Sequence, residues 1–166
     1  MWVVAKIRKR ELDFFKRDLI DKMGKEVRFY SPKIEYYKYF GKRTIRLERL
    51  ILENYIFCYH DNFKKSFFVN KLRFSKGLEY FLNGFSENQN QIVRFINCCK
   101  DFENEKGYLK QSFFRNKISK NARFISGPFS NMMFEIIEKQ KHKLKIAIDG
   151  IVMTVSDKTN YIYRPI

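Results

Sequence analysis

The spacing of apolar residues changes several times along the chain, and each change marks a new predicted element. Short runs rich in branched and aromatic residues predict strands, and apolar residues three and four positions apart predict helices. In the first hundred residues, the strand pattern covers residues 2–7, 27–30, 34–40, 44–50, 54–59 and 78–82. The helical pattern covers residues 12–23, 63–74 and 92–102. Because hairpins dominate this order, we expect an α+β fold with a ferredoxin-like antiparallel sheet and flanking helices.

Turn and capping residues support several of these boundaries. Gly24 suits the end of the first helix. The segment Gly41-Lys42-Arg43 is the predicted tip of a hairpin. Ser86 and Gln89 have the spacing of a capping box, which predicts the start of the third helix beside them.

The pattern is lost after residue 104. Residues 105–120 are mostly polar and charged, although Phe113-Phe114 and Ile118 interrupt them, and they predict a linker that packs against one domain. We therefore predict an N-terminal domain over residues 1–104 and a separate C-terminal domain over residues 121–166.

The C-terminal 46 residues, 121–166, contain several short runs of strand character. Strands are expected at residues 122–126, 134–138, 144–148, 151–155 and 161–163. Asp149-Gly150 between two such runs is a strong signal for a tight hairpin. So many short strands in so few residues can bury a core by curling into a small barrel, and we expect an SH3-like β-barrel here.

Charge adds a class of partner to this picture. The chain has 34 Lys and Arg residues against 18 Asp and Glu, a net charge of +16, and 15 of the basic residues lie within residues 1–50. A basic surface of this size attracts polyanions, and nucleic acid is the first candidate. A solvated basic surface without a specific partner is the alternative, and an acidic membrane surface is a weaker one because no cationic amphipathic helix stands out.

Residues suited to catalysis or metal binding are few. Cys58, Cys98 and Cys99 have no disulfide or metal spacing, and the only histidines, His60 and His142, lie far apart in the sequence. Phosphate-loop, nucleophile-elbow and paired-carboxylate motifs are absent from the sequence. We therefore expect no enzyme, no cofactor and no metal, a cytoplasmic location and no membrane span. A basic metal-dependent nuclease is the remaining enzymatic alternative.

Several short motifs in a fixed order resemble the NusG family of transcription elongation factors, and within it the specialised RfaH type. They are Trp2-Val3-Val4, Gly41-Lys42-Arg43-Thr44, Asn54-Tyr55-Ile56-Phe57, Ser75-Lys76-Gly77 before Leu78–Leu82, and Gly127-Pro128-Phe129. Each motif is weak alone, and their order spans nearly the whole chain. The resemblance implies an NGN domain followed by a KOW domain, in a monomer that suppresses pausing or termination of transcription, an antitermination activity.

The resemblance also implies sites. It implies that an aromatic hollow grips the clamp helices of RNA polymerase, with Tyr55 and Phe57 on one face of their strand and Phe81 as a neighbour. For Phe57 and Phe81 a place in the core is an equal alternative, whereas the hydroxyl of Tyr55 favours an interface. It implies that upstream or non-template DNA meets a set of basic residues: Arg8, Lys9, Arg10, Lys42, Arg43 and Lys76. A solvated charged face is the alternative for each of these.

The KOW domain is implied to recruit a partner, either the ribosomal protein NusE or the termination factor Rho. The corresponding residues are Ile125, Gly127, Pro128 and Phe129. A KOW-type RNA-binding or ribosome-binding protein without a polymerase role is the rival hypothesis. In the RfaH type the C-terminal domain can also form a helical hairpin. Eight β-branched residues between 136 and 155 and Asp149-Gly150 oppose that form, so we predict strands, although residues 131–145 would tolerate a helix.

Departures from the family pattern point to a specialised paralogue. Glu53 stands where the family usually has proline, and the His-Thr-Thr contact of the RfaH type falls near Phe68-Val69-Asn70. The glycine that usually follows Gly-Pro-Phe is missing from residues 130–134.

Overall fold

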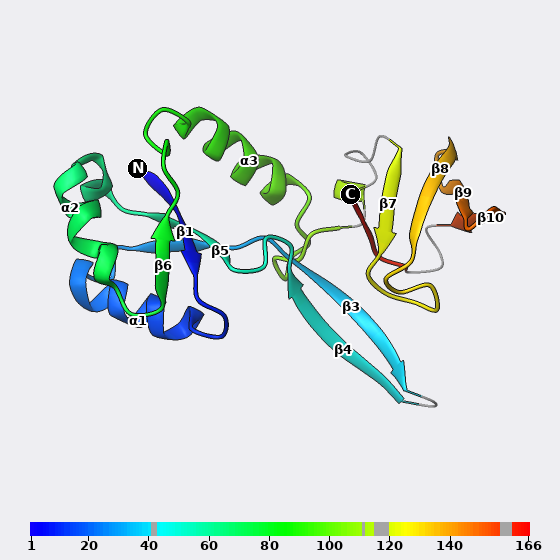
Figure 1. The fold of residues 1–166 in the computed structure, drawn as a ribbon, viewed down its shortest axis with the longest axis horizontal. Helices are drawn as coiled ribbons and strands as arrows, with labels where there is room; N and C mark the ends of the chain where they lie inside the picture. Colours follow the sequence, from blue (N-terminus) through cyan, green and yellow to red (C-terminus); the bar gives the residue numbers. More distant parts are fainter. Residues whose placement is uncertain (41–42, 111, 115–119, 157–160) are drawn as a thin grey trace. The chain divides into compact units, whose positions relative to one another are not determined.

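The computed structural model describes residues 1–40, 43–110, 112–114, 120–156 and 161–166. They form a mixed α+β protein with antiparallel sheets, as the sequence predicts. The chain packs into two compact units, one of Met1–Lys33 with Leu50–Asp101 and one of Ile34–Arg49 with Phe102–Ile166 (Figure 1). The domain boundaries at residues 104 and 120 stay a sequence-based prediction.

A four-stranded sheet of order β2-β5-β1-β6 forms the centre of the first unit. Its strands are β1 (Trp2–Ile7), β2 (Arg28–Tyr30), β5 (Tyr55–Tyr59) and β6 (Leu78–Phe81). In the antiparallel pairing of β1 with β5, Val4 lies opposite Phe57 and Ala5 lies opposite Ile56. Successive side chains of a strand point to opposite faces, so the two residue pairs belong to different sides of the sheet.

Two helices cover one face of this sheet: α1 (Leu12–Met23) and α2 (Ser66–Lys71). Phe15 and Leu19 of α1 are fully buried against this face with Ala5, Ile56 and other core residues. Helix α1 ends at Gly24, as predicted, with φ at 90° and its N–H donating to the Ile20 carbonyl at 2.7 Å.

The helix predicted over residues 63–74 is broken into three pieces. A 3-10 turn η1 (Asp61–Lys64) precedes α2, and a second turn η2 (Leu72–Phe74) follows it. Lys65 between η1 and α2 has extended backbone angles, with φ at −102° and ψ at 112°, which no continuous helix allows.

Helix α3 (Gln89–Asp101) covers the opposite face. Its Ile96 is buried with Val4 and Phe57, and the rings of Phe57 and Phe95 lie 5.6 Å apart. The predicted capping box is wrong, because the Gln89 side chain pairs with the backbone of β1. Its Oε1 accepts the Trp2 N–H at 3.0 Å, and its Nε2 donates to the Trp2 carbonyl at 2.7 Å.

The second unit contains two separate sheets among its described residues. Strands β3 (Lys33–Phe40) and β4 (Arg43–Leu50) pair with each other, and the predicted tip residues Gly41 and Lys42 lie outside the described residues. Five strands form the tail sheet, in the order β10-β9-β8-β7-β11.

The strands of the tail sheet agree closely with the sequence pattern. They are β7 (Asn121–Phe124), β8 (Met133–Lys139), β9 (Lys143–Ile148), β10 (Ile151–Ser156) and β11 (Tyr163–Pro165). The expected tight hairpin joins β9 to β10, with Asp149 at φ 47° and Gly150 at φ 82°. Phe124, Leu144 and Ile146 lie in the core of the tail sheet. The tail is therefore β in this structure, and its closure into an SH3-like barrel stays a prediction.

Candidate functional site: an apolar hollow between the sheet and α3

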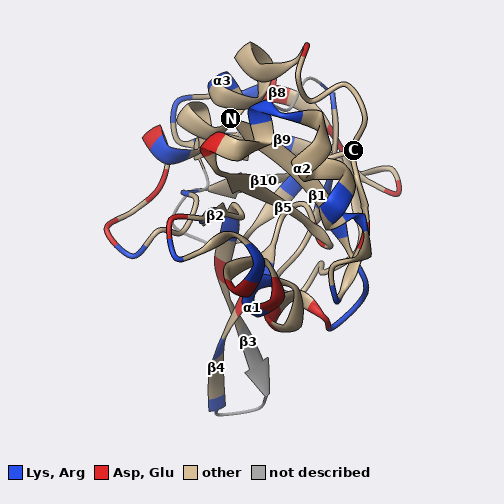
Figure 2. Cartoon of the chain, turned by 90° about the vertical axis from the view of Figure 1, so that its left-hand side faces the viewer, with Lys and Arg blue, Asp and Glu red and all other residues tan. Residues whose placement is uncertain are grey.

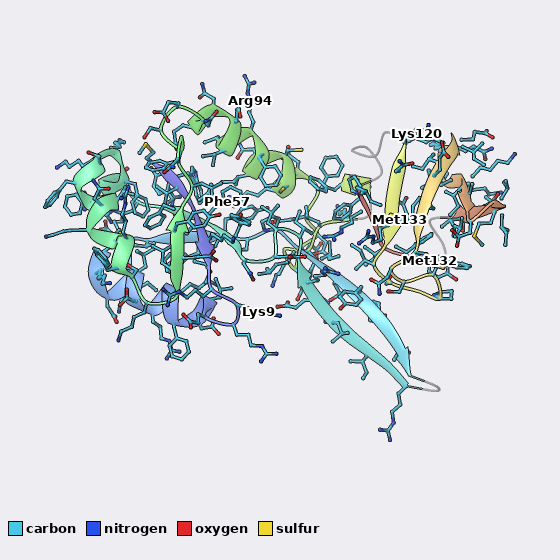
Figure 3. The ribbon with its side chains drawn as sticks, in the orientation of Figure 1. Lys9, Phe57, Arg94, Lys120, Met132 and Met133 are labelled. Atoms are coloured by element: carbon cyan, nitrogen blue, oxygen red, sulfur yellow. The ribbon has the colours of Figure 1, made fainter. Side chains whose placement is uncertain are left out.

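An open apolar hollow of about 400 Å³ lies between the sheet of the first unit and α3. Strand positions on the α3 side of the sheet form its floor, and one face of α3 forms its wall. Its lining consists of Val4, Leu52, Tyr55, Phe57, Leu82, Asn88, Gln91, Ile92 and Phe95. Figure 3 shows Phe57 beneath the helix. Because Phe57 is only 5% exposed, it closes the floor while the half-buried residues around it remain reachable.

Polar contacts hold Tyr55 at the edge of the hollow. The neighbouring Tyr80 hydroxyl is the main reason why the pKa of Tyr55 is raised above its ordinary value. On the neighbouring strands, Lys6 forms an ion pair with Glu79 at 3.2 Å and lies 5.3 Å from the centre of the Tyr80 ring. The ring of Tyr55 therefore lines the apolar hollow, and its hydroxyl lies at the polar edge of the hollow.

The three predicted polymerase-binding residues are not on one surface. Tyr55 and Phe57 share the face of the sheet that carries α3, in agreement with their alternation along β5. Phe81 is 8% exposed and belongs to the core on the other face, where its ring lies 6.4 Å from that of Phe63. Phe81 is absent from the lining of the hollow.

Four of the predicted nucleic-acid residues come together at one end of the first sheet. Arg8, Lys9 and Arg10 are exposed in the turn between β1 and α1, and Arg10 has a positive φ of 68°. The Arg8 N–H donates to the Gly77 carbonyl at 2.9 Å, which brings the turn beside exposed Lys76. Figure 3 labels Lys9 on this turn.

Acidic residues lie close to this basic group. Figure 2 shows both signs of charge along α1. Asp18 of α1 accepts the Lys76 N–H at 3.1 Å and pairs with Lys22 at 2.6 Å. The basic end is therefore a local cluster on a mixed surface.

The two remaining predicted basic residues belong to the hairpin. Arg43 is exposed at the start of β4, and Figure 2 shows this end of the strand as basic. Lys42 lies outside the described residues. Contact of either residue with DNA stays a prediction.

The predicted partner-binding residues of the tail differ in exposure. Ile125 is 7% exposed, Pro128 is exposed, and Phe129 is half-buried with its ring 5.8 Å from that of Phe124. A Cβ added to Gly127 would lie 2.6 Å from the ring of Tyr161. Pro128 and Phe129 are thus the members of this group that a partner could reach, and a partner contact there stays a prediction.

His60 and Cys58 are both buried in the first unit. The described residues contain no group of three His, Cys, Asp or Glu side chains that could hold a metal ion. His60 is 7% exposed and caps η1, with its Nδ1 accepting the Asn62 N–H at 3.1 Å. Burial raises the pKa of the Cys58 thiol strongly, which makes it unreactive. None of the helices described is both long enough and apolar enough to cross a membrane.

Sequence reasoning missed most of the hollow. The apolar stripe of α3 is visible in the sequence, yet a stripe of this kind does not distinguish a packed face from an open one. Ile92 and Phe95 therefore read as core residues. Leu52 follows the hairpin in a turn, and no pattern in the sequence marks it.

Comparisons with known proteins give only distant likenesses. No protein-family model and no curated protein matches the sequence. Among solved structures, the chain is similar to one in the MjSpt4:Spt5 complex in conformation B, with 10% identity, a TM-score of 0.29, and coverage of 98% of this chain and 96% of that chain. It is also similar to Thermotoga maritima NusG, with 16% identity, a TM-score of 0.34, and coverage of 93% and 91%. Both TM-scores are below 0.5, so neither likeness supports an argument about the hollow.

Proposed function

We propose that this chain is a NusG/RfaH-like, non-catalytic transcription elongation factor of the antitermination kind. In this proposal residues 1–104 are an NGN-like, ferredoxin-like domain that binds the RNA polymerase clamp helices, and residues 121–166 are a KOW-like barrel. Bridging the clamp would stabilise the processive state of the polymerase and suppress pausing or termination. The protein would act as a cytoplasmic monomer without a cofactor.

The observation that carries the proposal is the apolar hollow on the α3 side of the sheet. It contains Tyr55 and Phe57, two of the three residues that the family resemblance assigns to the polymerase, and not the third, Phe81. Its size of about 400 Å³ suits a few apolar side chains of a partner helix. The lining is apolar apart from Asn88 and Gln91 and includes no Lys or Arg that could contact phosphate, which favours a protein partner over a nucleic acid.

The basic cluster would extend the same interaction to upstream or non-template DNA. Arg8, Lys9, Arg10 and Lys76 are exposed side by side, and phosphate contacts need only accessible cations. Pro128 and Phe129 of the tail would recruit a further partner, for which NusE and Rho are the candidates.

The hollow can be tested by one substitution in the full chain. Tyr55→Ala should weaken binding to RNA polymerase by about 1–3 kcal/mol, because an aromatic anchor at the edge of a desolvated pocket is removed. Isothermal titration or biolayer interferometry with purified polymerase would measure the loss.

Phe14→Ala provides the matched control. Phe14 is 57% exposed on α1, on the face of the sheet away from α3, so its removal should leave the affinity unchanged. If folded Tyr55→Ala bound RNA polymerase as tightly as folded Phe14→Ala, the hollow would be removed from the proposal. Retention of RNA binding without any polymerase binding would favour the rival, a KOW-type RNA-binding or ribosome-binding protein.

A further inference from the structure

Residues 102–110 form a closed loop inside the second unit. The Asn104 side chain accepts the backbone N–H groups of Lys106 and Tyr108, both at 3.0 Å. The Asn104 N–H donates to the Tyr108 carbonyl at 2.9 Å, and Glu103 and Leu109 form a β-bridge. Gly107 allows the turn with φ at 74°, in the left-handed region that favours glycine. The loop therefore has a defined shape of its own.

Apolar residues anchor both ends of this loop. Leu109 and Phe113 are each 6% exposed, and the rings of Phe102 and Phe113 lie 5.9 Å apart. The Lys110 N–H donates to the Phe102 carbonyl at 2.8 Å, which closes the loop at its base. Because its base is buried, the loop is held in place and can restrain a neighbouring element that contacts it.

Tyr108 at the tip contacts the hairpin of β3 and β4. Its hydroxyl donates to Glu48 Oε2 at 3.0 Å, and the guanidinium of Arg46 lies 5.6 Å from the centre of its ring. Arg46 also forms an ion pair with Glu35 on the partner strand. A single tyrosine thus reaches β4 directly and β3 through Arg46.

A contact of this kind would stabilise the hairpin. Its two strands pair with each other in a two-stranded sheet, and an isolated two-stranded ribbon is marginally stable in water. The Tyr108 hydroxyl bonds to Glu48 in the half of β4 away from the predicted tip, and the Arg46 guanidinium near the middle of the strand lies at its ring, so one side chain restrains the ribbon at two positions.

We infer that residues 102–110 are a brace for the hairpin and that Tyr108 is the residue that positions it. The consequence for DNA rests on the proposed function: the brace would fix the direction in which Arg43 is presented to phosphate. Arg46 is engaged by Glu35 and Tyr108, whereas Arg43 is exposed at the start of β4, and Arg43 is the hairpin residue that we assign to phosphate.

Hydrogen exchange of the full chain tests the brace. Tyr108→Ala should speed exchange of the amides of residues 33–50 by about tenfold, the upper range for loss of one hydrogen bond and its ring contact. Tyr108→Phe keeps the ring and should give a smaller increase. Ile45→Ala, at an exposed position of the same hairpin, is the control and should change exchange less than Tyr108→Ala. Unchanged exchange in Tyr108→Ala, or an equal increase in β1 and β5, would overturn the inference.

A binding measurement separates the brace from the proposed DNA contact. If both hold, Tyr108→Ala should weaken binding of upstream-fork DNA in the elongation complex several-fold, and should have no further effect when Arg43 is already alanine. Faster hairpin exchange with unchanged DNA binding would keep the brace and remove the DNA contact of the hairpin from the proposed function. Rescue of DNA binding in Tyr108→Phe would support a positioning role.

Discussion

At the scale of single residues, Asp18 joins helix α1 to the segment that leads into β6. It accepts the Lys76 N–H and the Lys22 ammonium group, and Lys22 also contacts Ser75 Oγ at 3.3 Å. Burial alone would raise the pKa of Asp18, but the hydrogen bonds from Lys22 and Lys76 outweigh it, and the pKa lies below its ordinary value of 3.8. The ionised carboxylate is therefore the form that the folded protein prefers.

Because of the Asp18 contacts, we predict that the free energy of unfolding depends on pH. A carboxyl group with a lowered pKa stabilises the fold above the pKa of the unfolded chain, and the stabilisation is lost as the pH falls through the lower, folded value. Asp18→Asn should reduce the free energy of unfolding by about 1–3 kcal/mol at pH 7, the range for a hydrogen bond to a charged group. The difference from wild type should shrink as the pH falls below about 4. Urea denaturation across this pH range measures it, with exposed Asp21→Asn as the control. A difference that stays constant with pH would contradict the assignment.

The basic turn makes a second prediction at this scale. Replacing Arg8, Lys9 and Arg10 with alanine should reduce the salt dependence of DNA contact in the elongation complex by roughly one unit of slope per phosphate lost. The measurement is the slope of the logarithm of affinity against the logarithm of salt concentration. A slope equal to that of wild type would assign the three residues to a solvated face.

Phe81 illustrates what a sequence can and cannot predict about a site. The alternation of Tyr55 and Phe57 placed both on one face, because alternation within a strand is local. The face of Phe81 depends on how β6 pairs with β1, where Phe81 lies opposite Ala5 and the register shifts between Lys6 and Ile7. A shift of one residue moves a side chain to the other face, and no pattern within β6 reveals it.

At the scale of elements, the residues that end helices and form turns were the most informative part of the sequence. Gly24 and Asp149-Gly150 ended their elements as expected, since positive φ angles are needed there. The break at Lys65 was not visible in the spacing of apolar residues, and the contact of Gln89 was not visible because its partner is distant in the sequence. Gln89 pairs with Trp2, 87 residues away.

Gly77 allows a close approach between β6 and the start of α1. It has φ at 76°, and an added Cβ would lie 2.7 Å from the Glu11 carbonyl oxygen. Gly24 has a similar φ of 90° but nothing within 4 Å of such a Cβ. Gly77→Ala should therefore cost about 1–3 kcal/mol more than Gly24→Ala, because only the first adds a backbone clash to the shared cost of φ. Equal losses in melting experiments would show that the approach is not tight.

At the scale of the whole molecule, the strands of the tail were predictable because their signals are local. β-branched residues, alternation and Asp-Gly agree with one another over residues 133–156, and the observed strands follow them. The apolar hollow was not predictable, because it depends on the distance between a helix and a sheet. Sequence patterns indicate which faces are apolar and give no measure of how closely those faces approach.

The β form of the tail has a consequence for the full chain. Circular dichroism of residues 121–166, added to that of residues 1–120, should reproduce the spectrum of the intact protein, because the strands β7 to β11 pair with one another. A helical excess in the intact chain that disappears when residues 105–120 are cut would contradict this and would demonstrate a switch of fold.

The account depends most on the occupant of the apolar hollow. A photoreactive phenylalanine analogue at Ile92, which lines the hollow on α3, should form crosslinks to the clamp helices of RNA polymerase when the full chain is added to an elongation complex. The same analogue at Phe14, on the other side of the sheet, should form far fewer. Crosslinks to the polymerase from position 14 but not from position 92, or none from either in a chain that still binds, would contradict the proposed function.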